Sequence, residues 1–131
     1  MDLNIVTSRT LAVACAKLCD DKKADNIVIL DVRKIAFFTD FFVIATTTNE
    51  RQSKAIAESL RVEMKHKGHQ CLSNGTGAGS DGRWVLQDFG DVVVHLFNGE
   101  ARSFYDLESL WADAKATAWQ PKKKAAETTS G

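Results

Sequence analysis

Two short runs of β-branched and aromatic residues, close together in the chain, constrain the fold most. Residues 26–32 have the sequence NIVILDV and residues 41–47 have the sequence FFVIATT. Neither run alternates cleanly between polar and apolar residues, which is typical of strands that are buried on both faces. Helices must then cover the sheet, so the sequence predicts an α/β domain.

Helical periodicity supplies the covering elements. A first amphipathic helix is expected over residues 8–20, because apolar residues recur at helical spacing after a capping serine: Leu11, Ala12, Cys15, Leu18 and Cys19 follow Ser8. Asn49 can cap a second helix, and Gln52 can complete a reciprocal cap. Gly68 is placed to end this helix, whose buried stripe would be Ile56, Ala57, Leu60 and Met64.

The second half of the chain predicts a hairpin and a last helix. WVLQDF and VVVHLF flank Gly90-Asp91, which predicts an antiparallel hairpin with glycine at the turn. Residues 69–73 are expected to form a short strand, and the glycine-rich residues 74–82 a mobile loop. The final helix would bury one stripe, consisting of Phe104, Leu107, Leu110, Trp111 and Ala114.

These elements fit a single domain. The order of helices and strands predicts a mixed β-sheet of about five strands flanked by helices. At 131 residues with 44% hydrophobic residues, the chain is large enough for one core. We place the domain at residues 1–118 and expect residues 119–131, with lysines at 122–124, to be a disordered basic tail.

Charge and cysteine content exclude several classes of protein. Seventeen basic and seventeen acidic residues cancel, unlike the basic average of a dedicated nucleic-acid-binding protein. Three cysteines are an odd number, two of them on the apolar side of a helix, which favours a reducing cytoplasm. The N-terminal segment has neither a signal peptide nor a membrane span in its pattern.

Residues 84–111 concentrate ionisable groups, and one alternative function is a metal-dependent nucleotidyltransferase-like enzyme that would use Asp88 and Asp91. Asp88 and Asp91 would have to share a metal, yet strand alternation places Gly90 beside Asp88 and no third ligand is near in sequence. Carboxylates that cap the backbone of a turn are the more ordinary alternative. His66, His69 and Cys71 lack a fourth zinc ligand, and His95 lies among apolar residues. We therefore predict no catalytic residue, no metal and no cofactor.

A binding surface is the alternative function for this stretch. Residues 84–111 contain five acidic residues and one basic residue, Arg102, so a neutral chain has a local charge near minus four. This charge suits a basic protein partner. Trp84 and Leu86 share a strand face with Asp88, and the sequence leaves open whether they border the core or anchor an interface.

Three blocks resemble a known family: DFFVIATT (40–47), WVLQDFGDVVVHLF (84–97) and RSFYDLESLW (102–111) are similar to the ribosomal silencing factor, or Iojap, family. The resemblance implies a nucleotidyltransferase-like topology without catalytic residues. It also implies a repressor of translation that acts when nutrients are scarce. Such a protein binds the large ribosomal subunit through large-subunit ribosomal protein fourteen and blocks joining of the small subunit. Organelle relatives imply a possible role in ribosome biogenesis instead.

The resemblance also assigns residues. It places partner contacts at Trp84, Leu86, Asp88, Phe89, Gly90, Asp91, Arg102 and Tyr105. Relatives usually have Glu-Gly before the tryptophan, where this chain has Asn74-Gly75, so any contact from that glutamate is in doubt. The lysines of the tail are expected either to be solvated or to add a minor contact to ribosomal RNA. The free protein is expected to form a homodimer if its apolar strand face is exposed.

Overall fold

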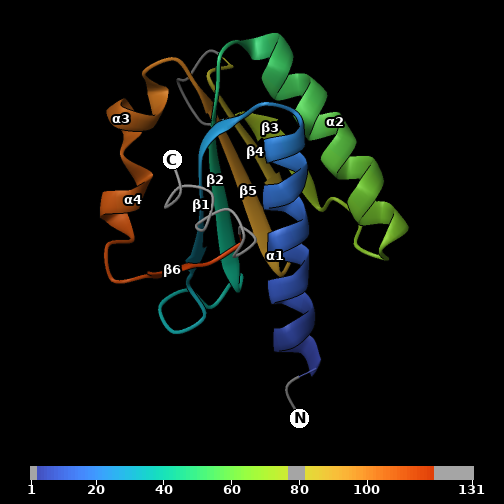
Figure 1. Ribbon diagram of the computed structural model, residues 1–131. Helices are drawn as coiled ribbons and strands as arrows, with labels where there is room; N and C mark the ends of the chain where they lie inside the picture. The colour runs from blue at the N-terminus through green and yellow to red at the C-terminus, as the bar shows by residue number, and fades with distance from the viewer. Residues whose placement is uncertain (1–2, 77–81, 120–131) are drawn as a thin grey trace, which may run out of the picture.

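The computed structural model describes residues 3–76 and 82–119, which form three layers around one mixed sheet (Figure 1). Six strands have the order β3-β4-β5-β2-β1-β6. The elements in chain order are α1 (Leu3–Asp21), β1 (Asp25–Asp31), β2 (Phe41–Thr47), α2 (Glu50–His66), β3 (Ser73–Thr76), β4 (Trp84–Asp88), β5 (Val92–Asn98), α3 (Ala101–Tyr105), α4 (Leu107–Leu110) and β6 (Lys115–Thr117).

The sheet is built around one parallel pair. β2 and β5 run parallel in the centre, with Phe41 opposite Val92 and Thr47 opposite Asn98. Every other neighbouring pair is antiparallel. This arrangement confirms the α/β class and the mixed sheet, and it places the hairpin of β4 and β5 between the centre and one edge.

Two long helices cover one face of the sheet (Figure 1). α1 buries the apolar residues that recur at helical spacing, and α2 buries Ile56, Ala57, Leu60 and Met64, as predicted. The two helices touch each other, with the Cys15 thiol 3.7 Å from the Met64 sulfur. Gln87 of β4 donates a hydrogen bond of 2.9 Å to the carbonyl of Ala57, so this layer also holds the hairpin.

The cap of α2 follows the prediction with one shift. The Asn49 side chain accepts from the backbone N–H of Gln52 at 2.8 Å. The Gln52 side chain returns to the N–H of Thr48, not of Asn49, at 2.7 Å. Gly68 has φ +86 and follows the helix, as expected for a glycine stop.

Two strands differ from the sequence prediction. The strand expected at residues 69–73 lies instead at Ser73–Thr76, within the segment predicted to be a loop. The remainder of that loop includes residues 77–81, which are outside the described residues. β6 was not predicted, because its three residues have no apolar pattern and pair only along β1.

The last helix is interrupted, which is the largest error of the sequence prediction. Asp106 adopts φ +49, so the segment forms two short helices, α3 and α4. Leu107 is buried, as predicted. Phe104 and Leu110 are 78% and 76% exposed, so the prediction that they belong to the core is wrong. A break of the helix rotates residues that would share one stripe onto different sides.

The domain was predicted to end at residue 118, and Trp119, the first residue of the predicted tail, has defined contacts. The Trp119 indole packs against the core on the side of α1 and donates to the carbonyl of Ile27 at 3.2 Å. Residues 120–131 are outside the described part of the chain. Among the helices that the structure describes, none is long and apolar enough to cross a membrane.

Candidate functional site

The hairpin presents three predicted contact residues on one side. Trp84, Leu86 and Asp88 alternate along β4 and are each half-buried, whereas Val85 and Gln87 point into the layer of α1 and α2. Trp84 and Leu86 pack against the buried cluster on the face of the sheet that carries α3 and α4, which includes Phe42, Phe97 and Leu107. The surface formed by Trp84, Leu86, Asp88 and Tyr105 is called the hairpin patch below.

Trp84 lies in an aromatic environment that fixes its orientation. Its indole Nε1–H donates a hydrogen bond of 3.2 Å to Nδ1 of His95 on β5. The Trp84 ring is 5.0 Å from the Tyr105 ring and 5.1 Å from the Phe97 ring, measured between centroids. These contacts leave the indole partly open to solvent while holding it in one position, as in a preorganised binding residue.

Burial decides the charge of His95. The side chain is 4% exposed and its pKa is lowered to about 4, because the charged imidazole loses its hydration among apolar neighbours. His95 is therefore neutral at pH 7. Its Nδ1 must be the unprotonated nitrogen in order to accept from Trp84, so the proton lies on Nε2. These properties fit a buried structural histidine, in line with its apolar neighbours in the sequence.

Of the two aspartates predicted as partner contacts, Asp88 and Asp91, only Asp88 uses its side chain in the turn of the hairpin. The Asp88 side chain accepts a hydrogen bond of 2.8 Å from the N–H of Gly90. Gly90 has φ +91, a conformation that favours glycine in a two-residue turn between strands. Asp91 acts through its backbone, since its carbonyl accepts from the N–H groups of Asp40 and Phe41 at 3.0 and 3.1 Å. The turn is thereby fixed to the start of β2.

Phe89 lies apart from the other predicted contacts. Its side chain is 3% exposed and belongs to the cluster covered by α1 and α2. Phe89 is thus placed to hold the turn from the opposite face of the sheet. Asp40, directly before β2, accepts a hydrogen bond of 2.9 Å from the hydroxyl of Ser8 on α1.

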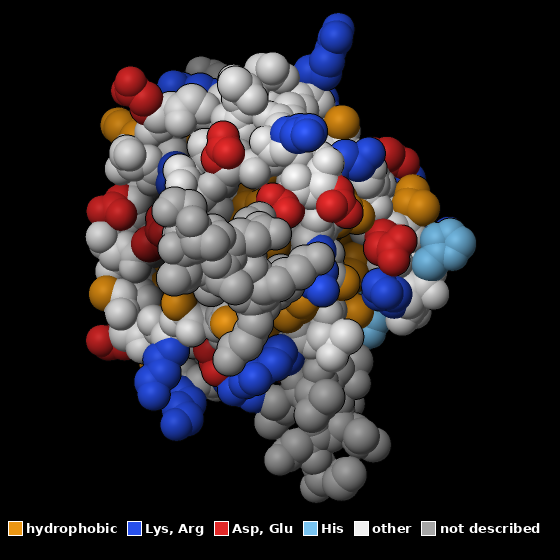
Figure 2. Space-filling model, viewed as in Figure 1, with side chains coloured by type: hydrophobic (Ala, Val, Ile, Leu, Met, Phe, Trp, Pro, Cys, Tyr) orange, Lys and Arg blue, Asp and Glu red, His pale blue; other side chains and the backbone are white. Residues whose placement is uncertain are grey.

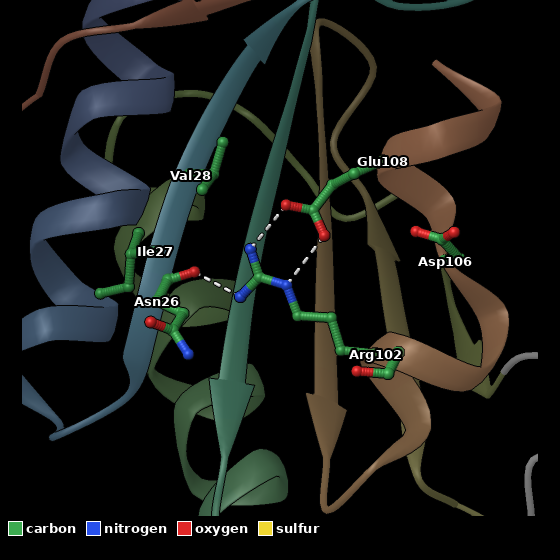
Figure 3. Close-up of a pocket in the computed structure, with 7 residues that line it drawn as sticks. Asn26, Ile27, Val28, Arg102, Asp106 and Glu108 are labelled. Atoms are coloured by element: carbon green, nitrogen blue, oxygen red, sulfur yellow. Dashed lines mark hydrogen bonds and ion pairs between the residues drawn. The ribbon is translucent and has the colours of Figure 1, made fainter. Parts of the chain in front are cut away.

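Arg102 is committed to contacts inside the chain (Figure 3). Its guanidinium forms a two-point ion pair with Glu108, at 3.0 Å from Nε and 2.9 Å from Nη2. Nη1 donates to the backbone carbonyl of Asn26 and, at 2.9 Å, to the Thr46 hydroxyl. Asn26 has φ +50 and lies where the register of β1 against β2 shifts. Arg102 therefore ties α3 and α4 to an irregular point of the sheet.

The carboxylates of this stretch do not gather into one cluster in the part of the chain that the structure describes. Among the described residues there is no group of three or more His, Cys, Asp or Glu side chains that could hold a metal ion. Asp88 spends one carboxylate oxygen on its own turn, as the ordinary alternative supposed. The hairpin patch thus presents aromatic and aliphatic side chains on the same strand face as the carboxylate of Asp88.

The sequence prediction missed His95 as the partner of Trp84. The two-residue turn fixes the register of the hairpin, which pairs Trp84 with Phe97 and Leu86 with His95. His95 is consequently diagonal to Trp84 on the same face, within reach of a long side chain. The two-residue turn would have been sufficient to predict that Trp84 and His95 are close. It could not predict that Nδ1 of His95 accepts the bond or that His95 is buried.

Known proteins share this fold and sequence. The model of the family described as "Ribosomal silencing factor during starvation" matches residues 6–131. The ribosomal silencing factor RsfS of Bacillus subtilis is 37% identical over 109 residues, which cover 83% of this chain and 91% of that protein. The chloroplastic Iojap protein of Arabidopsis thaliana is 38% identical over 107 residues, or 82% of this chain and 44% of that protein.

Solved structures give the same result. A crystal structure of a protein from Chromobacterium violaceum has a TM-score of 0.72 at 31% identity, covering 86% of this chain and 92% of that chain. A second, from Bacillus halodurans, has a TM-score of 0.65 at 37% identity, covering 83% and 94%. With a three-layer fold, a matching family model over most of its length and relatives of nearly the same extent, the chain belongs to the family of ribosomal silencing factors.

Proposed function

We propose that this protein binds the large ribosomal subunit through its protein fourteen and, by occupying that surface, prevents the small subunit from joining. Membership of the family supports a role in ribosome silencing during starvation. A family of ribosome regulators also points to a protein that is not an enzyme. The observation that carries the proposal is the hairpin patch, where a half-buried tryptophan of fixed orientation shares one strand face with Leu86 and Asp88.

The physical case rests on what the hairpin patch can contribute to an interface. Trp84 and Leu86 supply apolar area that is only partly covered within the chain. A tryptophan whose orientation is already fixed loses little conformational entropy on binding, which favours affinity. Asp88 and Asp91 border this area, so a partner rich in lysine and arginine is attracted and oriented.

The eight assigned residues then divide by their contacts. Trp84, Leu86, Asp88 and Tyr105 form the exposed surface, and Gly90 and Asp91 shape the adjoining turn. Phe89 and Arg102 act from within, since one is buried under α1 and α2 and the other is bound to Glu108 and Asn26. Lysines 122–124 could add a minor, salt-sensitive attraction to ribosomal RNA. A ribosomal partner of this kind would place the protein in the cytoplasm.

The test is a reconstitution from purified parts. Mature large subunits are pelleted with and without the protein, and small subunits are then added to the resuspended particles. We expect the protein to co-sediment with large subunits and to reduce the yield of joined ribosomes. Absence of co-sedimentation, or undiminished joining when the protein is bound, contradicts the proposal. Association with precursor particles alone would indicate a role in biogenesis instead.

A further inference from the structure

Aromatic rings form a continuous path across the face that carries α3 and α4. Centroid distances of 4.9–6.4 Å connect consecutive members of the path from one exposed end to the other. The path follows the order Phe37, Phe38, Trp111, Phe42, His95, Trp84, Tyr105 and Phe104. Phe42 and His95 in the middle of the path are buried, at 3% and 4% exposed, so the rings connect the hairpin patch through the core to the residues on the far side of α3 and α4.

The ends of this path are open to solvent. Phe37 is fully exposed, Phe38 is 55% exposed, and Phe104 and Leu110 are each more than three-quarters exposed. We call Phe37, Phe38, Phe104, Leu110 and Trp111 the aromatic face. Figure 2 shows hydrophobic side chains reaching the surface on the side of the molecule that carries α3 and α4. An apolar area of this kind on a small protein marks an interaction site.

The fold leaves this face uncovered for a local reason. The left-handed Asp106 ends α3 after five residues, and α4 has only four. Two such short helices cover the middle of the sheet face at Ala101 and Leu107 but leave its flanks open. In contrast, α1 and α2 are 19 and 17 residues long and bury the other face.

We infer that the same basic protein partner that binds the hairpin patch also covers the aromatic face, so that one docking surface extends from β4 to the loop before β2. The inference rests on the proposed function. Within the described part of the chain, the hairpin turn and the segment that carries α3 and α4 contain five carboxylates that form no ion pair: Asp88, Asp91, Glu100, Asp106 and Asp113. The basic residues near the loop before β2 are Arg33, Lys34 and Lys115, and Arg33 is paired with Asp31, so the unpaired basic residues are fewer than the unpaired carboxylates.

This charge pattern selects among possible occupants. Exposed aromatic rings could also stack on nucleic-acid bases, but carboxylates at the border repel phosphates. A second copy of the chain would bring the same carboxylates against each other, which is unfavourable. A protein surface with apolar side chains surrounded by lysine and arginine satisfies both the rings and the carboxylates.

The test replaces side chains that contribute nothing to the core. Phe37→Ser and Leu110→Ser remove exposed apolar groups, alone and together, and Val62→Ser is the matched control. Val62 is 42% exposed on α2, in the opposite layer. Binding to purified large subunits is measured by co-sedimentation at fixed salt. We expect each single variant to weaken binding by about threefold or more, the double variant by about tenfold or more, and the control to leave binding unchanged.

The outcomes separate this inference from the proposed function. Failure of the wild-type protein to bind large subunits overturns the proposed function and, with it, this occupant. Binding of the wild type together with equal binding of the double variant overturns only the inference. Self-association of the free wild type, lost in the double variant while subunit binding is retained, would assign the face to a second copy and overturn it as well. Should Leu110→Ser unfold the protein, Phe37→Ser supplies the same comparison.

Discussion

The indole N–H of Trp84 on β4 donates a hydrogen bond to Nδ1 of His95 on β5, the neighbouring strand of the same hairpin. This intramolecular hydrogen bond occupies the one polar group of the indole. A partner would therefore contact the apolar part of the Trp84 ring. The hydrogen bond also requires an unprotonated Nδ1, which burial among Phe42, Phe97 and Trp84 favours by lowering the pKa of His95 to about 4. The orientation of Trp84 is therefore linked to the protonation state of a buried base.

The first prediction concerns the dependence of stability on pH. The pKa of His95 is about 4 in the folded chain and about 6.5 in the unfolded chain. Between these values the unfolded state binds the extra proton, so stability is complete above pH 6.5 and falls as the pH falls toward 4. We expect His95 to contribute a loss on the order of 3 kcal/mol from pH 7 to pH 4.

The measurement is urea unfolding of the wild type and His95→Leu at pH 7, 5.5 and 4. The variant removes the titrating group, so the difference between the two proteins isolates the contribution of His95 from that of other ionisable groups. The free energy of unfolding of the variant should depend less on pH over this interval. An equal pH dependence in both proteins would mean that His95 does not titrate with a lowered pKa.

The second prediction is that Arg102 stabilises the chain, because its side chain is only 14% exposed and binds three elements. Arg102→Met leaves Glu108 and the Asn26 carbonyl without this donor, and we expect a loss of about 2 kcal/mol. Hydrogen exchange should quicken across α3 and α4 and stay unchanged in α2. Urea unfolding and exchange measurements check both statements.

A matched control exists on α2. Arg61 forms a similar two-point contact with Glu58, at 3.2 and 2.6 Å, but both side chains are largely in solvent. Arg61→Met should lower the free energy of unfolding much less than Arg102→Met does, because exposed ion pairs contribute little. Equal losses in the two variants would show that Arg102 is no more than a surface ion pair.

The sequence was sufficient for those parts of the fold that depend on local pattern. FFVIATT forms a strand with the bounds Phe41–Thr47, and the turn at Gly90 forms because only a residue tolerant of positive φ fits there. The break at Asp106 had no such signal. Aspartate rarely adopts φ +49, and the contact between Arg102 and Glu108 that accompanies the break joins side chains from both short helices.

The site was predictable to a similar degree. Strand alternation grouped Trp84, Leu86 and Asp88 correctly on one side of β4. The assignment by resemblance did not distinguish Phe89, which faces the opposite layer, or Arg102, whose guanidinium is bound within the chain. Burial and pairing across the sheet are long-range properties, and they decide whether a residue forms a surface or supports one.

The third prediction concerns the cysteines. Burial raises the pKa of Cys19 to about 12 and raises that of Cys15 as well, so neither forms a thiolate near neutral pH. Cys71 is half-buried, and burial raises its pKa too. We expect iodoacetamide at pH 8 to modify Cys71 slowly in the folded protein and to modify all three cysteines in urea. Peptide mass spectrometry locates the label, and early modification of Cys15 or Cys19 would contradict their burial in the core.

The last prediction concerns Trp84 in the proposed interface. If its ring is a central anchor, Trp84→Ala should weaken binding to the large subunit by about 2 kcal/mol or more, or roughly thirtyfold. Trp84→Phe should lose less, because an aromatic ring remains against Tyr105. Trp119→Phe is the control, since that indole donates to Ile27 on the side of α1 and should not alter binding. Co-sedimentation provides the affinities, and circular dichroism verifies folding. Unchanged binding by a folded Trp84→Ala protein would make Trp84 a residue at the edge of the core.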